Sequence, residues 1–110
     1  MASYVPEAGD LVWLQFNPQA GHEQAGHRPA VVISPASYNG KTGLMLCCPM
    51  TTKVKNYPFE VVLSSAKFGV ALADQVKSLD WRARKASLKG KVSPAELTEI
   101  RAKACALIGK

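Results

Sequence analysis

Two short stretches of this sequence concentrate the residue types that perform acid–base and phosphate chemistry. The first is GHEQAGHRP at residues 21–29, which holds one carboxylate, two imidazoles and a guanidinium beside two glycines. The second is PMTTK at residues 49–53, which places two hydroxyls and an amine after an apolar run. Loops positioned by a rigid scaffold often carry function, but a polar surface loop and two strand-ending threonines are the ordinary alternatives.

Cleavage of RNA would give these residue types defined roles. The ribose 2′-OH attacks phosphorus, a base takes its proton, an acid protonates the leaving 5′-oxygen, and the added phosphoryl charge is stabilised. The guanidinium of Arg28 matches phosphate oxygens, and Thr51 could donate to the same oxygens. Glu23 is a candidate base, and His22 and His27 in the same loop are alternatives that the spacing allows but does not require.

Metal and cofactor chemistry lacks its usual signatures in this sequence. Paired carboxylates with metal-site character, zinc-finger spacing, a phosphate loop and a dinucleotide fingerprint are all missing. Cys47 and Cys48 are adjacent, so on a strand they point to opposite faces and cannot easily share one metal. We interpret these two and Cys105 as reduced thiols, two of them in the core. The prediction is no metal and no cofactor.

Bulk composition narrows the class of protein. The 110 residues suit a single domain, residues 1–110, and 47% hydrophobic with 20% charged residues suits a folded chain rather than a disordered one. The formal net charge of +6 fits a polyanionic partner such as RNA, DNA or an acidic protein, or a plain basic surface. With no membrane-length apolar run and no leader-like start, we expect a cytoplasmic protein without membrane contact.

Short β-type segments must position the two chemical stretches. Apolar runs bounded by turn residues predict strands over residues 9–16, 28–34, 44–49, 59–63 and 70–76, with a short sixth near 87–92. Residues 37–43 are interpreted as a turn. This pattern favours a small barrel or strongly bent sheet.

The C-terminal part of the chain predicts one amphipathic helix. Ser93, Pro94 and Glu96 form a capping-box start, and Gly109 is a plausible C-cap. Helical spacing predicts one apolar face from Leu97, Ile100, Ala104, Leu107 and Ile108. We expect this helix to cover one opening or face of the sheet.

Five motifs in a fixed order make the chain resemble the MazF/PemK family of toxin–antitoxin toxins. They are GDLVW (9–13), GHEQAGHRPAVV (21–32), PMTT (49–52), YPFEVVL (57–63) and ALADQVKS (71–78), and they extend over nearly the whole length. The resemblance implies a mainly β fold with α, an SH3-like small barrel of the MazF/CcdB type with a C-terminal amphipathic helix. It implies a homodimer and an acidic MazE-like antitoxin partner.

The resemblance also implies an activity. This is metal-independent endoribonuclease cleavage of single-stranded mRNA at short sequences containing ACA, leaving 2′,3′-cyclic phosphate and 5′-OH ends. The result would be inhibition of translation and growth. The main alternative on the same fold is a CcdB-like, non-enzymatic poison of DNA gyrase, and a third is a generic SH3-like nucleic-acid-binding module. Neither of these accounts for an intact GHEQAGHRP loop.

Carried over residue by residue, the resemblance assigns catalysis to Arg28 and Thr51, with Glu23 as a supporting acid or base. Kid-type toxins use instead a histidine and an aspartate that match His22 and Asp74, but Leu72 stands where they carry an arginine, which favours the first assignment. We expect RNA contacts from Phe16, Asn17, His22, Gln24, Thr52, Lys53, Lys55, Asp74, Gln75, Lys77 and Arg84.

Overall fold

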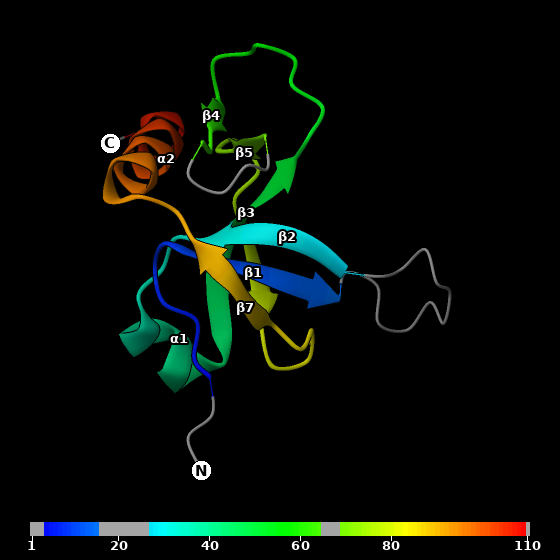
Figure 1. Ribbon diagram of the computed structural model, residues 1–110. Helices are drawn as coiled ribbons and strands as arrows, with labels where there is room; N and C mark the ends of the chain where they lie inside the picture. Colours follow the sequence, from blue (N-terminus) through cyan, green and yellow to red (C-terminus); the bar gives the residue numbers. More distant parts are fainter. Residues whose placement is uncertain (1–3, 16–26, 65–68, 110) are drawn as a thin grey trace.

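The computed structural model describes residues 4–15, 27–64 and 69–109 (Figure 1). Within these ranges seven strands form one antiparallel sheet in the order β4-β5-β3-β2-β1-β7, and β6 also pairs with β3. The strands are β1 (Asp10–Gln15), β2 (His27–Val32), β3 (Leu44–Thr51), β4 (Glu60–Val62), β5 (Val70–Leu72), β6 (Lys77–Asp80) and β7 (Ser87–Lys91), and the helices are α1 (Ala36–Thr42) and α2 (Pro94–Leu107).

Strand β3 organises the sheet because it changes partners along its length. Its first half pairs with β6 from Leu44↔Asp80 to Cys47↔Lys77, and its last two residues pair with β5 through Met50↔Ala71 and Thr51↔Val70. On its other edge the ladder with β2 ends at Ala30↔Pro49. The sheet therefore bends along β3, and the last residues of β3 lie apart from β2 and pair with β5.

Alternating side chains on the central strands build two separate cores, one on each face. Leu11, Val31 and Cys48 belong to a core that Ile100 of α2 completes. Their neighbours in sequence, Val12, Val32 and Cys47, belong to the other core, which also includes Trp81. Because neighbouring strand residues face opposite ways, Cys47 and Cys48 are both buried yet lie in different cores, as the sequence predicts.

Helix α1 corrects the prediction of a simple turn over residues 37–43. Its sequence, ASYNGKT, contains poor helix formers, and its N-cap Pro35 makes no side-chain cap. Tertiary bonds supply the stability instead. Asn39 is 0% exposed, its amide donates to the carbonyls of Pro6 and Ser34 at 2.8 and 3.0 Å, and its backbone carbonyl accepts from the Trp81 indole at 2.9 Å.

The segment predicted as one strand over residues 70–76 is two elements. Strand β5 ends at Leu72, and a turn at 73–74, closed by Gln75 N–H donating to Leu72 C=O at 3.1 Å, separates it from β6. The apolar residues over 70–76 give no sign of this break, because β5 and β6 both pair with the same strand, β3. The turn leaves Asp74 and Gln75 exposed next to the end of β3.

Helix α2 begins with the predicted capping box. Glu96 N–H donates to Ser93 Oγ at 3.1 Å, and Ser93 N–H donates to the Glu96 carboxylate at 3.0 Å. Gly109, with a φ of 91°, follows the C-cap Ile108. The predicted apolar face holds only in its first part, because Leu107 and Ile108 are 52% and 80% exposed.

Figure 1 shows α2 beside β4 and β5 at one end of the molecule and α1 near the other end. The bent sheet with a C-terminal helix agrees with the predicted small-barrel class, although its edges do not close into a complete barrel in the part of the chain described. No helix among these residues is both long and apolar enough to cross a membrane.

Candidate active site

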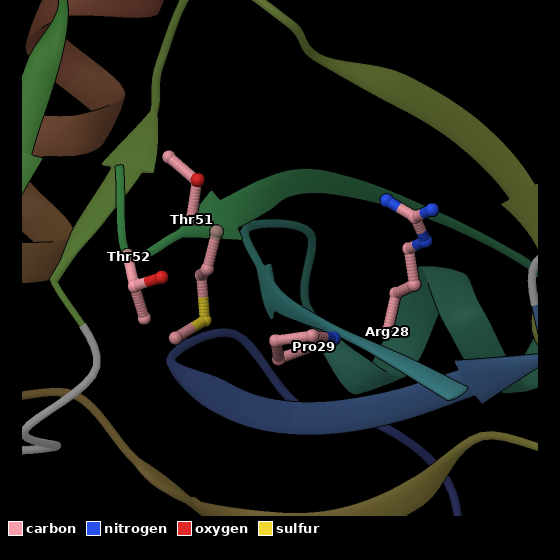
Figure 2. Close-up of a pocket in the computed structure, with 5 residues that line it drawn as sticks. Arg28, Pro29, Thr51 and Thr52 are labelled. Atoms are coloured by element: carbon pink, nitrogen blue, oxygen red, sulfur yellow. The ribbon is translucent and has the colours of Figure 1, made fainter. Parts of the chain in front are cut away.

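A cavity of about 280 Å³ opens where β3 leaves β2, and it brings the two predicted chemical stretches together. It is lined by Arg28, Pro29, Met50, Thr51 and Thr52. Figure 2 shows the Arg28 guanidinium and the Thr51 side chain at two ends of this cavity, with Pro29 between them. One arginine and two threonines thus border a single open cavity.

The sheet itself explains why a gap exists there. Continuing the β2–β3 register beyond Ala30↔Pro49 would place Arg28 opposite Thr51, but the ladder ends at Pro49, and Thr51 is paired on its other edge alone, with Val70 of β5. Pro29, which would face Met50 in this register, has no N–H with which to continue the ladder. The strands therefore separate with their side chains still facing the same space.

Backbone contacts hold Thr51 in place. Gly69, with a φ of 90°, lies so close that an added Cβ would come within 2.4 Å of the Thr51 carbonyl oxygen. The Thr51 hydroxyl oxygen accepts a hydrogen bond from Lys53 N–H at 3.0 Å. A hydroxyl has one donor and two acceptor positions, so this bond orients Thr51 and leaves its proton for a ligand oxygen.

A second cavity, of about 200 Å³, adjoins the first at Thr51. It lies between the loop that follows β3 and the turn that follows β5. Its lining residues are Thr51, Lys53, Lys55, Tyr57, Glu60, Leu72 and Gln75. Two amines, a phenol and an amide therefore surround space directly beside the hydroxyl of Thr51.

A hydrogen bond joins the two sides of this second cavity. The Tyr57 hydroxyl donates to the Asp74 carboxylate, which raises the pKa of the Tyr57 phenol above its ordinary value. Tyr57 therefore stays protonated as the donor, and Asp74 acts in the structure as an acceptor that ties the turn to the loop. A base-reading role for Asp74 would have to share this carboxylate.

Apart from Arg28, Thr51 and Asp74, which are placed above, the predicted site residues fall into three groups. Thr52 lines the first cavity, and Lys53, Lys55 and Gln75 line the second. Lys77 lies on β6, paired with Cys47, and Arg84 donates from Nη1 to the Gln15 carbonyl at 3.2 Å, at the end of β1. The remaining predicted residues, which are Phe16, Asn17, His22, Glu23 and Gln24, lie outside the described residues.

Tyr57 and Glu60 were not singled out from the sequence, although both line the second cavity. Glu60 had one available signal, since it is a charged residue inside the otherwise apolar strand FEVVL. Among the described residues, no three His, Cys, Asp or Glu side chains group together so as to hold a metal ion.

An arginine and an oriented hydroxyl beside a cluster of amines define a small β protein suited to an anionic ligand. The chain belongs to the family described as PemK-like, MazF-like toxins of type II toxin–antitoxin systems, which matches residues 7–108. The predicted family is thereby confirmed.

Individual relatives match most of the chain or nearly all of it. The endoribonuclease toxin MazF of Escherichia coli (strain K12) is 62% identical over 110 residues, covering 99% of each chain. The endoribonuclease PemK of Escherichia coli is 30% identical over 100 residues, covering 86% of this chain and 75% of that protein.

Solved structures share the fold. The crystal structure of MazF (Form-I) from Deinococcus radiodurans superposes with a TM-score of 0.86 at 55% identity, covering 98% of this chain and 100% of the other. That of MazE–MazF (Form-II) from the same organism gives a TM-score of 0.86 at 49% identity, covering 97% and 98%. The predicted MazF-type fold is confirmed by this similarity.

Proposed function

We propose that this chain is a metal-independent endoribonuclease toxin that cuts single-stranded RNA at a short sequence containing ACA. The observation that carries the proposal is the cavity shared by Arg28 and Thr51. A phosphate in that cavity would meet a guanidinium from one strand and a hydroxyl donor from the next. The endoribonuclease names of the MazF and PemK relatives support the same activity.

The proposed reaction is an internal transfer at phosphorus. The 2′-oxygen bonds to phosphorus and gives its proton to a base, while the bond to the 5′-oxygen breaks and that oxygen takes a proton. The products are a 2′,3′-cyclic phosphate and a 5′-OH. Arg28 and Thr51 stabilise the charge on the phosphoryl oxygens, and the base is Glu23 or a histidine of the same loop.

The second cavity is proposed to take a nucleotide next to the cut. Lys53 and Lys55 supply positive charge for the backbone, and Gln75 supplies an amide for a base edge. Thr52, Lys77 and Arg84 are proposed to extend this contact, together with Phe16, Asn17, His22, Gln24 and Asp74. Unpaired bases are needed for such contacts, which is the reason to propose a single-stranded substrate.

Cleavage of mRNA in the cytoplasm would stop translation and growth, and an antitoxin would have to prevent this. We propose that an acidic MazE-like antitoxin binds the +6 chain and that the single domain of residues 1–110 acts as a homodimer. Deinococcus radiodurans MazF solved together with MazE supports the partner.

The decisive experiment incubates the purified protein with a long RNA in EDTA and maps new 5′-OH ends by sequencing. The expected result is defined fragments that share one short sequence and carry cyclic phosphates. Replacing the ribose at the cut by deoxyribose should abolish cleavage and leave binding largely intact. Loss of activity in EDTA with rescue by Mg²⁺, or intact RNA with inhibited DNA gyrase, would refute the proposal.

A further inference from the structure

The loop between β3 and β4 has an ordered shape without a core to support it. The side chains of residues 52–58 are all exposed, so none is anchored by apolar burial. Lys53, Lys55 and Tyr57 of this loop nevertheless line the second cavity beside Thr51. Something other than hydrophobic packing must therefore hold these three residues in place.

Besides the bonds from Tyr57 to Asp74 and from Lys53 N–H to Thr51, one carboxylate binds the backbone at the centre of the loop. The Glu60 side chain accepts hydrogen bonds from the N–H groups of Lys55 and Asn56 at 2.9 Å each and of Tyr57 at 3.4 Å. Asn56 has a φ of 59°, in the left-handed region. Successive N–H groups that converge through such a residue form a concave anion-binding nest, and Glu60 fills it from within the chain.

Glu60 is itself attached to the rigid part of the fold. Its backbone pairs with Leu72 at the start of β4, next to the fully buried Val61. Lys103 of α2 donates to the carbonyls of Pro58 and Glu60 at 2.6 and 3.2 Å. The carboxylate thus connects an exposed loop to a sheet edge and a helix that do not depend on the loop for their own packing.

We infer that Glu60 is a positioning residue that holds the Lys53–Tyr57 loop so that the second cavity receives the nucleotide beside the cut. This inference rests on the proposed function. Glu60 acts through the loop backbone, because both of its carboxylate oxygens accept hydrogen bonds from loop N–H groups. The consequence is that Glu60 affects substrates that reach the second cavity more than substrates that end at the scissile phosphate.

Both the negative charge and the two acceptor oxygens of Glu60 are required to bind the three loop N–H groups. Glutamine has the same shape but offers one acceptor oxygen, and its NH₂ group would oppose the loop N–H groups. Aspartate keeps the charge but is shorter by one methylene, so it cannot reach all three N–H groups from the same backbone position. Both substitutions should loosen the loop and leave the sheet and helix intact.

The test compares RNA lengths rather than a single rate. Wild type and Glu60→Gln are given a single-stranded RNA of about ten nucleotides that contains the mapped site, together with two versions cut back to the site on the 5′ or the 3′ side. The truncation that lowers kcat/KM for the wild type reports occupancy of the second cavity. We call the ratio of kcat/KM for the full RNA to kcat/KM for that truncated RNA the length advantage. Glu60→Gln should reduce this length advantage by about tenfold, mainly through KM.

Controls separate positioning from folding. Asp80→Asn removes an exposed carboxylate at the end of β6, beside the start of β3, that accepts a hydrogen bond from Ala83 N–H at 2.8 Å. It should keep the wild-type length advantage. Melting temperatures should be similar for all variants, and Glu60→Asp serves as a second variant should Glu60→Gln fail to fold. It should change the length advantage in the same direction.

Three outcomes would overturn the inference. The first is an unchanged length advantage in a folded Glu60 variant, and the second is an equal loss on long and truncated RNA. The third is a wild type that cleaves all three RNAs equally, since the second cavity would then hold no nucleotide. A wild type that cuts no RNA at all overturns the proposed function as well, so the two failures are distinguishable.

Discussion

Arg28 and Thr51 occupy opposite positions in the continued register of β2 and β3, yet the ladder between these strands ends at Ala30↔Pro49, before it reaches them. The side chains of directly opposed residues in a complete ladder would be in contact. Here the strands separate first, and a cavity of about 280 Å³ opens with Arg28 and Thr51 in its lining. A ligand group can therefore enter between two residues that the sheet still aims at the same space.

The first prediction concerns the guanidinium group of Arg28. Preorganised donors to a developing oxyanion contribute about 10²–10³-fold in rate. We expect Arg28→Lys to lose about that much, because it keeps the charge but not the planar fork, and Arg28→Ala to lose more. Single-turnover cleavage measures the effect. RNA affinity and melting temperature should change far less, and a variant that melts much earlier would instead show a structural role.

The second prediction concerns the hydroxyl of Thr51. Thr51→Val keeps the shape but loses both the donor to the ligand and the acceptor for Lys53 N–H. Cleavage should slow by about 10²-fold, whereas Thr51→Ser should recover most of the rate. The paired measurement is kcat for the three proteins on the same RNA. Equal rates for Thr51→Val and wild type would remove Thr51 from the mechanism.

The third prediction concerns the close approach of Gly69 to β3. Gly69→Ala would add a Cβ 2.4 Å from the Thr51 carbonyl oxygen, at a residue with a φ of 90°. Such strain costs about 1–3 kcal/mol, so the melting temperature should fall and Thr51 should be displaced. Gly90→Ala is the matched control, since its new Cβ would meet only Leu11 at 3.7 Å. Similar melting temperatures for the two variants would contradict the prediction.

The fourth prediction concerns the buried carboxylate of Asp10, which is 2% exposed. Burial opposes its ionisation, but hydrogen bonds from Lys91 at 2.7 Å, Tyr4 at 2.5 Å and Glu7 N–H at 3.0 Å outweigh this and lower its pKa. A lowered pKa in the folded state stabilises the fold above the ordinary pKa of Asp, and this contribution is lost as the pH falls through the folded value.

Asp10→Asn should therefore destabilise the protein by about 1–3 kcal/mol near neutral pH. Because protonation removes the same charge from the wild type, the difference should shrink at about pH 3. Urea unfolding at both pH values measures it. Asp80→Asn, at the exposed end of β6, should cost less. A difference between Asp10→Asn and wild type that grows on acidification would contradict the prediction.

The sequence by itself determined the local elements and the residue types of the site. Alternating apolar residues predict most of the strands, and the capping box predicts the start of α2 at Pro94. These signals depend on neighbours within a few residues, so they are legible along the chain. Arg28 and Thr51 were also identified, because the motifs that contain them resemble those of one toxin family.

Only the tertiary structure decided what depends on distant partners. Helix α1 exists because buried Asn39 bonds to Pro6 and to Trp81, which lie far from it in sequence. The strand predicted over residues 70–76 divides because β3 has two partners in succession on one edge. Leu107 and Ile108 are exposed because the sheet covers only part of the predicted apolar face. Helical spacing predicts which side chains share a face, but not how much of that face is buried.

The role of Glu60 is also decided by the tertiary structure. A single acidic residue in an apolar strand indicates no function by itself, since its partners are backbone N–H groups whose direction no residue type specifies. Those groups converge only because Asn56 adopts a left-handed conformation and β4 returns to pair with β5. The sequence specifies the carboxylate, and the folded chain directs towards it the three N–H groups from which it accepts hydrogen bonds.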